Sequence, residues 1–286
     1  MKRQLVGLGI AISVTAILLA VAIVKPGTTP KTFDKVSEKL PDSAQTIRLT
    51  RPDKPDIVLQ KVAGSWQLQA PLASPANASR ARALSSLAAA SIIRSYHVDE
   101  LSLKAIALSP PRFHIQLDDL ELALGAVEPV DKLRYLRVGD QVHLVPNEIT
   151  HHLSATPEGF VDPTLLAGQE RIQTLRLPTV TISSTGETLS WEPEDVFNSA
   201  DQAAEVIARW QRASAFLVEP LNLALRWSRP VTITTRDGTH LKFLIARNKT
   251  TLFLGRRDTK IQYRIGAQTG LQLLGATPIK RQPRGG

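Results

Sequence analysis

Histidines and carboxylates are the residues whose types could carry chemistry in this chain, but their spacing gives that chemistry little support. The chain has six histidines, and His151-His152 is the only adjacent pair. Neighbouring side chains of a helix or strand point apart, so this pair is poorly placed to bind one metal ion. The other histidines are scattered through strand-like segments. We therefore expect packed or solvated histidines and no metal site.

Two acidic clusters could suggest general acid–base catalysis, and each has a simpler structural interpretation. Asp118-Asp119 lies between two apolar runs, where Asp is a preferred turn residue. Glu192, Glu194 and Asp195 flank Pro193, and an acidic first turn complements a helix dipole. We therefore predict no catalytic residues and a protein that is not an enzyme. A hydrolase is the least supported of the functions that we weighed.

Composition and motifs also argue against a bound cofactor. The absence of cysteine excludes disulfides, thiolate zinc sites, iron–sulfur clusters and a cysteine nucleophile. Gly7-Leu8-Gly9 lies inside an apolar segment, so it is not a nucleotide-binding loop. The chain also lacks the Gly-x-Ser-x-Gly pattern of a nucleophile elbow. We expect no cofactor.

The formal net charge of +9 is concentrated in the C-terminal part of the chain. A basic surface attracts anionic lipid headgroups, acidic envelope polymers or nucleic acid. Trp227 lies close to Arg226 and Arg229 and could anchor a partner or lipid headgroups. We predict contact with a partner or with lipid through Trp227, Arg247, Lys249, Arg256, Arg257, Lys260 and Arg264.

The first half of the chain has the pattern of an antiparallel sheet with one main helix. Alternating apolar and polar residues predict strands over 46–50, 57–62 and 65–69, with Ala63-Gly64 as a hairpin turn. Asn77 is the expected N-cap of a helix that reaches about Ser91. Two further hairpins are predicted around the turns Asp118-Asp119 and Gly139-Asp140. One face of such a sheet would be covered by the helix.

The same order of elements recurs in the second half, which predicts an α+β fold of two related halves. Strands are expected over 175–177, 179–182, 189–191, 231–234 and 240–246, with a helix over 202–214. The recurrence matches Trp191 to Trp66, Tyr263 to Tyr135, and the segment 271–273 to the predicted strand 142–144. We predict that these tryptophans and tyrosines form the core of each repeat. A role of the two tryptophans in stacking a ligand is the alternative.

Residues 5–24 form a run of twenty residues without a charge. A helix of about 20 residues spans the hydrocarbon core of a bilayer. We predict a retained signal anchor, with a signal peptide cleaved after Ala20-Val21-Ala22 as the alternative. Lys2 and Arg3 favour a cytoplasmic N-terminus and three later lysines oppose it. The short cationic tail favours the N-terminus inside and the bulk outside, where nucleic acid is the least expected partner.

These patterns divide the chain into seven segments. They are a cytoplasmic tail 1–4, a transmembrane signal anchor 5–24, a linker 25–44, a first α+β repeat 45–150, a connector 151–171, a second α+β repeat 172–276 and a basic tail 277–286.

Several short motifs, taken in order, resemble the bacterial domain of unknown function 4340 family. They are Trp66–Pro71, Ala76-Asn77 at a helix start, Leu108–Pro111, Tyr135–Val145 and Phe160–Leu166. The resemblance covers about residues 43–276. It departs at Asn77, where Asp is more usual, and before Leu108, where Tyr-Gly is usual.

The resemblance implies an envelope protein with an N-terminal anchor, often encoded beside gliding-type ABC exporter components. It therefore implies a single-pass protein of the bacterial inner membrane with its N-terminus inside and its bulk in the periplasm or outside. We expect a non-enzymatic accessory or scaffold protein that contacts other membrane or envelope proteins, such as an ABC-type export system. The alternative is an envelope lipid- or polymer-binding module that uses the basic C-terminal half. The oligomeric state is not indicated.

Overall fold

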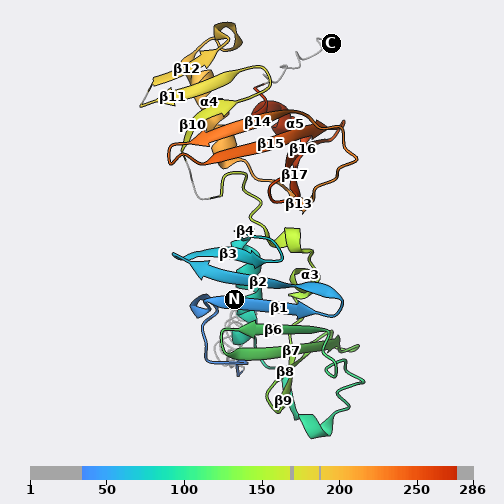
Figure 1. Cartoon of the computed structure of the whole chain (residues 1–286). Coiled ribbons are helices and arrows are strands. Elements are labelled where there is room, and N and C mark those ends of the chain that lie inside the picture. The colour runs from blue at the N-terminus through green and yellow to red at the C-terminus, as the bar shows by residue number, and fades with distance from the viewer. Residues whose placement is uncertain (1–33, 168–170, 187, 276–286) are drawn as a thin grey trace, which may run out of the picture. The chain divides into compact units, whose positions relative to one another are not determined.

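The computed structural model describes residues 34–167, 171–186 and 188–275, which form two antiparallel sheets with few helices (Figure 1). This part of the protein is therefore mostly β, with less helix than the predicted α+β fold. The predicted anchor 5–24 and the basic tail 277–286 lie outside the described residues. Within the described ranges, no helix is long and apolar enough to cross a membrane.

The first sheet has nine strands in the order β4-β3-β2-β1-β6-β7-β8-β9-β5 (Figure 1). Its strands are β1 (Thr46–Arg51), β2 (Lys54–Val62), β3 (Ser65–Ala70), β4 (Ser74–Pro75), β5 (Arg94–His97), β6 (Phe113–Leu117), β7 (Leu120–Val127), β8 (Arg134–Val138) and β9 (Gln141–Val145).

The second sheet has eight strands in the order β12-β11-β10-β14-β15-β16-β17-β13. Its strands are β10 (Ile172–Arg176), β11 (Thr181–Thr185), β12 (Thr188–Glu192), β13 (Leu217–Pro220), β14 (Ser228–Thr235), β15 (His240–Arg247), β16 (Thr251–Arg256) and β17 (Ile261–Gly266).

Short helices connect and cover these strands. The α-helices are α2 (Ala78–Ser85), α3 (Thr150–Leu153), α4 (Ala200–Arg212) and α5 (Ala267–Leu273). The 3-10 helices are η1 (Pro41–Ser43), η2 (Ser86–Ala89), η3 (Val98–Glu100), η4 (Pro157–Phe160) and η5 (Glu194–Val196).

Apart from β4, the two sheets have the same strand order. In each, three strands form a meander and a helix follows. The next strand lies at the far edge, and the last four strands fill the space between, beginning beside the first strand and ending beside the edge strand. A short helix, α3 or α5, then follows the last strand. The helix α2 packs on β1 and β3, and α4 packs on β10 and β12. The recurrence of elements that the sequence predicts is thus present as a shared strand order.

Local sequence explains the turns and the helix start. Ala63 and Gly64 have φ of 48° and 81°, the positive values that a two-residue hairpin turn requires and that glycine adopts without strain. Asn77 caps α2, because its side-chain oxygen accepts a hydrogen bond from the Arg80 backbone N–H at 3.2 Å. Both features confirm the sequence-based predictions.

The core lies on the helix-covered face of each sheet. In β1, Ile47 and Leu49 are fully buried and alternate with exposed residues. In the second half, the fully buried side chains of Trp210 on α4 and Phe243 on β15 have ring centroids 5.8 Å apart. Large buried side chains of this kind supply most of the hydrophobic stabilisation.

Two predictions about the second half are wrong. Residues 271–273 lie in α5 and not in a strand. The pairing of Tyr263 with Tyr135 is shifted by one strand, because Tyr135 lies on β8, whose counterpart is β16, whereas Tyr263 lies on β17. The cause is β16, whose first five residues are all buried, so that it lacks the alternation by which half-buried strands are recognised.

The predicted linker 25–44 ends earlier than expected. The backbone N–H groups of Val36 and Ser37 donate to the carbonyls of Ala90 and Ala88, at 3.1 and 2.8 Å. Residues 35–44 therefore belong to the first half. In the predicted connector, the backbone N–H of Asp162 donates to Pro75 and that of Leu165 donates to Ala213, so the connector bonds to both halves.

Candidate functional site

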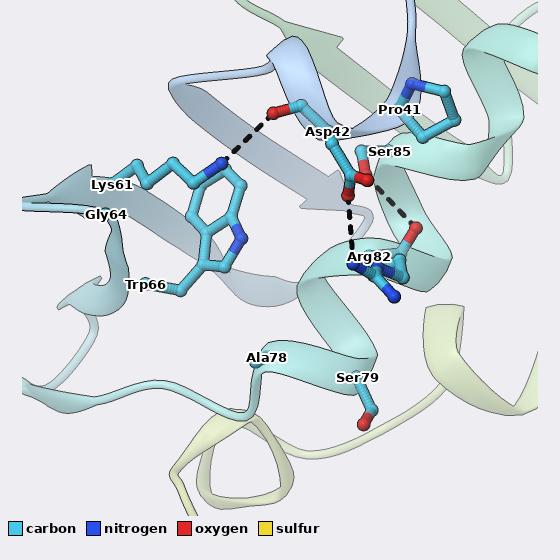
Figure 2. Close-up of a pocket in the computed structure, with 9 residues that line it drawn as sticks. All are labelled: Pro41, Asp42, Lys61, Gly64, Trp66, Ala78, Ser79, Arg82 and Ser85. Carbon is cyan, nitrogen blue, oxygen red and sulfur yellow. Dashed lines mark hydrogen bonds and ion pairs between the residues drawn. The ribbon is translucent and has the colours of Figure 1, made fainter. Parts of the chain in front are cut away.

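A hollow of about 420 Å³ opens beside Trp66 in the first half (Figure 2). The β2–β3 hairpin, η1 and α2 supply its walls. The lining residues are Pro41, Asp42, Lys61, Gly64, Trp66, Ala78, Ser79, Arg82 and Ser85.

The hairpin register places a lysine next to the indole of Trp66. Lys61 and Trp66 are directly paired across β2 and β3, and the Lys61 Nζ lies 5.6 Å from the ring centroid. That distance is within cation–π range. Lys61 Nζ also donates a hydrogen bond to the Asp42 carbonyl oxygen at 3.0 Å. Trp66 was among the predicted site residues and Lys61 was not, although the two-residue turn at Ala63-Gly64 is sufficient to place Lys61 opposite Trp66.

An ion pair closes the other side of this hollow. Arg82 of α2 lies 3.3 Å from the Asp42 carboxylate, and both side chains are more than 70% exposed, at 72% and 73%. Such an exposed pair contributes little to stability. The hollow thus combines the Trp66 ring with exposed charged side chains. Its lining offers hydroxyls but no histidine, so it is suited to stacking a flat ligand and poorly suited to acid–base chemistry.

Trp191 occupies the corresponding strand of the second half, β12. Its Nε1 donates to the Glu194 carbonyl oxygen at 3.0 Å, and its ring meets the ring of Phe197 edge to face at 5.9 Å. A second hollow, of about 580 Å³, is lined by Trp191, Glu192 and Glu194. Like Trp66, Trp191 is partly buried against the core. Each tryptophan therefore packs on the core and also lines a hollow.

The two tyrosines of the predicted repeat core differ in their surroundings. Tyr263 is buried, and its ring centroid lies 6.2 Å from that of Phe243. Burial raises the pKa of the Tyr263 hydroxyl. Tyr135 is only partly buried. The predicted core role therefore agrees with the burial of Tyr263 and less well with the partial burial of Tyr135.

The predicted basic contact region is divided by β16. Arg247 and Lys249 lie at the end of β15 and in the following turn, whereas Arg257 and Lys260 lie in the β16–β17 turn. A six-residue strand places its ends roughly 17–20 Å apart. The predicted residues therefore form two separate groups.

Two of the predicted basic residues are held by other side chains. Arg256 pairs with Asp258 and lies 6.0 Å from the ring centroid of Phe243. Burial acts to lower the pKa of Arg256, but hydrogen bonding to Asp258, the charge of Asp258 and the contact with Tyr263 together raise it. The Arg264 guanidinium lies 5.5 and 5.6 Å from the ring centroids of Phe216 and Phe253. These contacts leave both arginines less available to an outside ligand.

Trp227 packs onto the sheet instead of projecting as an anchor. A Cβ at Gly255 on β16 would lie 2.8 Å from the Trp227 ring and 2.7 Å from the Leu221 Cδ1. The Trp227 Nε1 donates to the Asn222 carbonyl oxygen at 3.1 Å. Because Trp227 is half-buried and held in this way, it is a poor candidate for a projecting surface anchor.

Arg247 and Lys249 lie on two adjoining hollows beside α5. One hollow, of about 540 Å³, also contains Arg226, and the other, of about 190 Å³, contains Lys249. Both hollows are lined by Arg247, Leu271 and Leu274. Sequence patterns missed the two leucines, because the segment 271–273 was expected to be a strand.

The histidine pair is held within the first half. The ring centroids of His151 and His152 lie 3.8 Å apart in α3, and Arg80 approaches His152 Nδ1 to 3.4 Å. Burial, then His151 and then Arg80 lower the pKa of His152 to about 4. Within the described ranges, no three or more histidines or acidic residues lie close enough together to hold a metal ion.

The described residues thus define a mostly β protein of two antiparallel sheets with hollows beside two tryptophans and beside α5. The model of the family described as Domain of unknown function (DUF4340) matches residues 66–242, which is more than half of the chain. The chain belongs to this family, as the ordered motifs indicated. Neither the curated proteins nor the solved structures include a match.

Proposed function

We propose that this chain is a membrane-anchored, extracytoplasmic, non-enzymatic accessory or scaffold protein of a membrane complex. An ABC-type export system is the specific complex that we favour. Its predicted anchor is the uncharged run of residues 5–24. Membership of a family for which this arrangement is expected supports the proposal.

The observation that carries the proposal is an exposed apolar surface at the edge strand β13. Phe216, Leu217 and Leu223 are 63%, 41% and 79% exposed, and they fall within eight consecutive residues. β13 is the terminal strand of its sheet, and η4 of the connector packs beside it. Exposed apolar patches mark protein contacts.

Phe216 has a contact within its own chain that orients its ring. The Arg264 guanidinium lies 5.5 Å from its ring centroid, and Arg264 also lies 3.7 Å from the Glu219 carboxylate. A pre-oriented aromatic side chain loses less conformational entropy on binding. The segment 216–223 is therefore suited to hold a partner protein.

Affinity capture tests this proposal. The full-length chain is solubilised gently from its own membranes and captured, and co-purifying proteins are identified by mass spectrometry. We expect membrane proteins to be retained by the natural sequence and largely lost from the double variant Phe216→Ser, Leu223→Ser. The matched control is Leu40→Ser, Val130→Ser, which removes two side chains that are 70% and 80% exposed elsewhere.

Two results would contradict the proposal. One is the absence of stable co-purifying membrane proteins, and the other is an equal loss from both double variants. The predicted topology is tested separately by a reporter fused after Gly286. A reporter that is active only in the cytoplasm would overturn the assignment of the bulk to the periplasm.

A further inference from the structure

The two adjoining hollows beside α5 form one groove with apolar and cationic parts, which we call the α5 groove. Its walls come from the β10–β11 connection, the start of β14 and the residues before it, the end of β15, the β15–β16 turn and α5. The residues that both hollows share are Arg247, Leu271 and Leu274. The larger hollow, of about 540 Å³, is within the usual range of ligand pockets, about 300–1,000 Å³.

The floor of the α5 groove is apolar. Ile245 and Ala246 of β15 lie in the larger hollow, and Leu252 of β16 lies in the smaller one. A Cβ at Gly270 would lie 2.6 Å from the Leu252 Cβ, so α5 lies directly against β16. Leu271 remains 46% exposed at the groove. This leucine is apolar surface that a ligand could remove from water.

The rim of the α5 groove is cationic. Arg226, Arg247 and Lys249 are exposed and line it. No acidic residue belongs to either lining, and none of these three forms an ion pair with another described residue. Positive charge without a counter-charge beside an apolar floor complements an anionic headgroup on a hydrocarbon chain.

We propose that the α5 groove binds an anionic membrane phospholipid. An acyl chain lies on the floor beside Leu271, and the phosphate is held by Arg226, Arg247 and Lys249. The chain's own tail is a poorer occupant, because residues 276–286 carry Lys280, Arg281 and Arg284 and no acidic residue. Like charges on tail and rim repel each other. This inference does not depend on the partner surface at β13.

Photo-cross-linking tests the proposal. The full-length chain is placed in nanodiscs that contain phosphatidylglycerol or phosphatidylcholine with a photo-reactive acyl chain, and modified peptides are mapped by mass spectrometry. We expect phosphatidylglycerol to label residues 245–252 and 267–275 about ten-fold more than phosphatidylcholine. Raising the salt concentration should reduce this difference.

Two double variants of equal charge separate the groove from general surface attraction. Arg247→Gln, Lys249→Gln removes two charges from the rim, and Arg257→Gln, Lys260→Gln removes two charges from the other end of β16. We expect the first to lower labelling about ten-fold and the second to leave it within two-fold. Leu271→Gln, which keeps the charge, should lower labelling about five-fold.

Several outcomes would overturn the proposal. Equal losses in the two double variants would show diffuse electrostatic attraction, and equal labelling by both lipids would show no selection for an anion. Labelling confined to residues other than 178–179, 226–228, 245–252 and 267–275 would place the lipid elsewhere. A rise in labelling on truncation after Gly275 would make the tail the occupant. The variant Phe216→Ser, Leu223→Ser should retain labelling even if it loses its partner proteins.

Discussion

The two halves of this protein share a strand order but differ in the contact between the main helix and the short helix that follows the last strand. In the first half, Arg80 of α2 approaches the His151 carbonyl oxygen and His152 Nδ1 of α3, each at 3.4 Å. In the second half, the buried Trp210 of α4 donates from its Nε1 to the Leu273 carbonyl oxygen of α5 at 2.8 Å. The first contact is polar and part-exposed, whereas the second is an aromatic side chain in the core.

The faces of the sheets opposite the helices show a related difference. In each half, the segment after the edge strand crosses the sheet above a glycine. In the first half the Ile106 backbone lies against Gly125, and in the second half the side chains of Leu221 and Trp227 lie against Gly255. The crossing segment therefore contacts the sheet through its backbone in the first half and through side chains in the second. In both halves the glycine has no side chain, which leaves room for the crossing segment.

Replacement of Trp210 should give the largest effect. Trp210→Ala removes a fully buried indole and its hydrogen bond, and we expect a loss of about 3–5 kcal/mol in the free energy of unfolding. Trp66→Ala, at a half-buried ring, should cost about 1–2 kcal/mol. Urea unfolding followed by circular dichroism measures both. If Trp210→Ala and Trp66→Ala lowered the free energy of unfolding equally, the buried Trp210 contact would not be the stronger of the two.

Replacement of Arg134 tests a buried polar group of the first half. Its guanidinium donates to Gly125, Asn147 and Thr150 at 2.7–2.9 Å. Arg134→Met removes this donor from all three groups. The Gly125 carbonyl oxygen loses its bond to Arg134, whereas Asn147 Oδ1 still accepts from Thr150 Oγ1 at 2.6 Å, and we expect a cost of about 2–3 kcal/mol. Thr251 is the corresponding first residue of β16, and Thr251→Val should cost less than about 1 kcal/mol. A larger loss for Thr251→Val in urea unfolding would reverse the comparison.

Alanine at the two glycines tests the crossings. A Cβ at Gly125 would overlap the Ile106 carbonyl oxygen, which accepts a hydrogen bond from the Ala126 N–H at 2.8 Å. We expect Gly125→Ala to cost about 2–3 kcal/mol and Gly255→Ala about 1 kcal/mol, because side-chain ends move more readily than backbone. Thermal and urea unfolding measure the difference. A costlier Gly255→Ala would contradict it.

The smallest expected effect is a dependence on pH that arises in the first half. His152 has a pKa of about 4 in the folded chain against 6.5 ordinarily. The unfolded chain therefore binds the proton more readily, and stability falls as the pH decreases from about 6.5 toward 4. The His152→Asn variant should lose this contribution, which we expect to be below about 1 kcal/mol for a part-exposed group.

The free energy of unfolding of the natural chain and of His152→Asn is measured at pH 7 and at pH 5. The helix α5 in the second half contains no histidine. Hydrogen exchange should therefore show the acid sensitivity around α3 and not around α5. An identical pH dependence in the variant would remove His152 as its source.

Much of the local structure could be predicted from sequence, because its causes are local. The alternation in β1 and β2, the Ala63-Gly64 turn and the cap at Asn77 depend on residues a few positions apart. The tryptophans of β3 and β12 were matched correctly for the same reason. The register of the β2–β3 hairpin also places Lys61 opposite Trp66, whereas Trp191 lies opposite Ile182.

The candidate sites were less predictable, because strand order brings their residues together. Charge along the chain suggested one basic region, but β16 separates Arg247 and Lys249 from Arg257 and Lys260. The groove beside α5 joins Arg226 to Arg247 and Leu271, which are 21 and 45 positions away from it. No pattern within a short window contains that information.

The sequence by itself therefore determined the hairpins, the two main helices, the repeated order of elements and the family. Tertiary structure alone decided that β5 and β13 lie at the sheet edges, that residues 271–273 form a helix and that β16 is a strand. The physical reason is burial. Where both faces of a strand are covered, the polar residues that mark its period are absent, and only the packed neighbours define it.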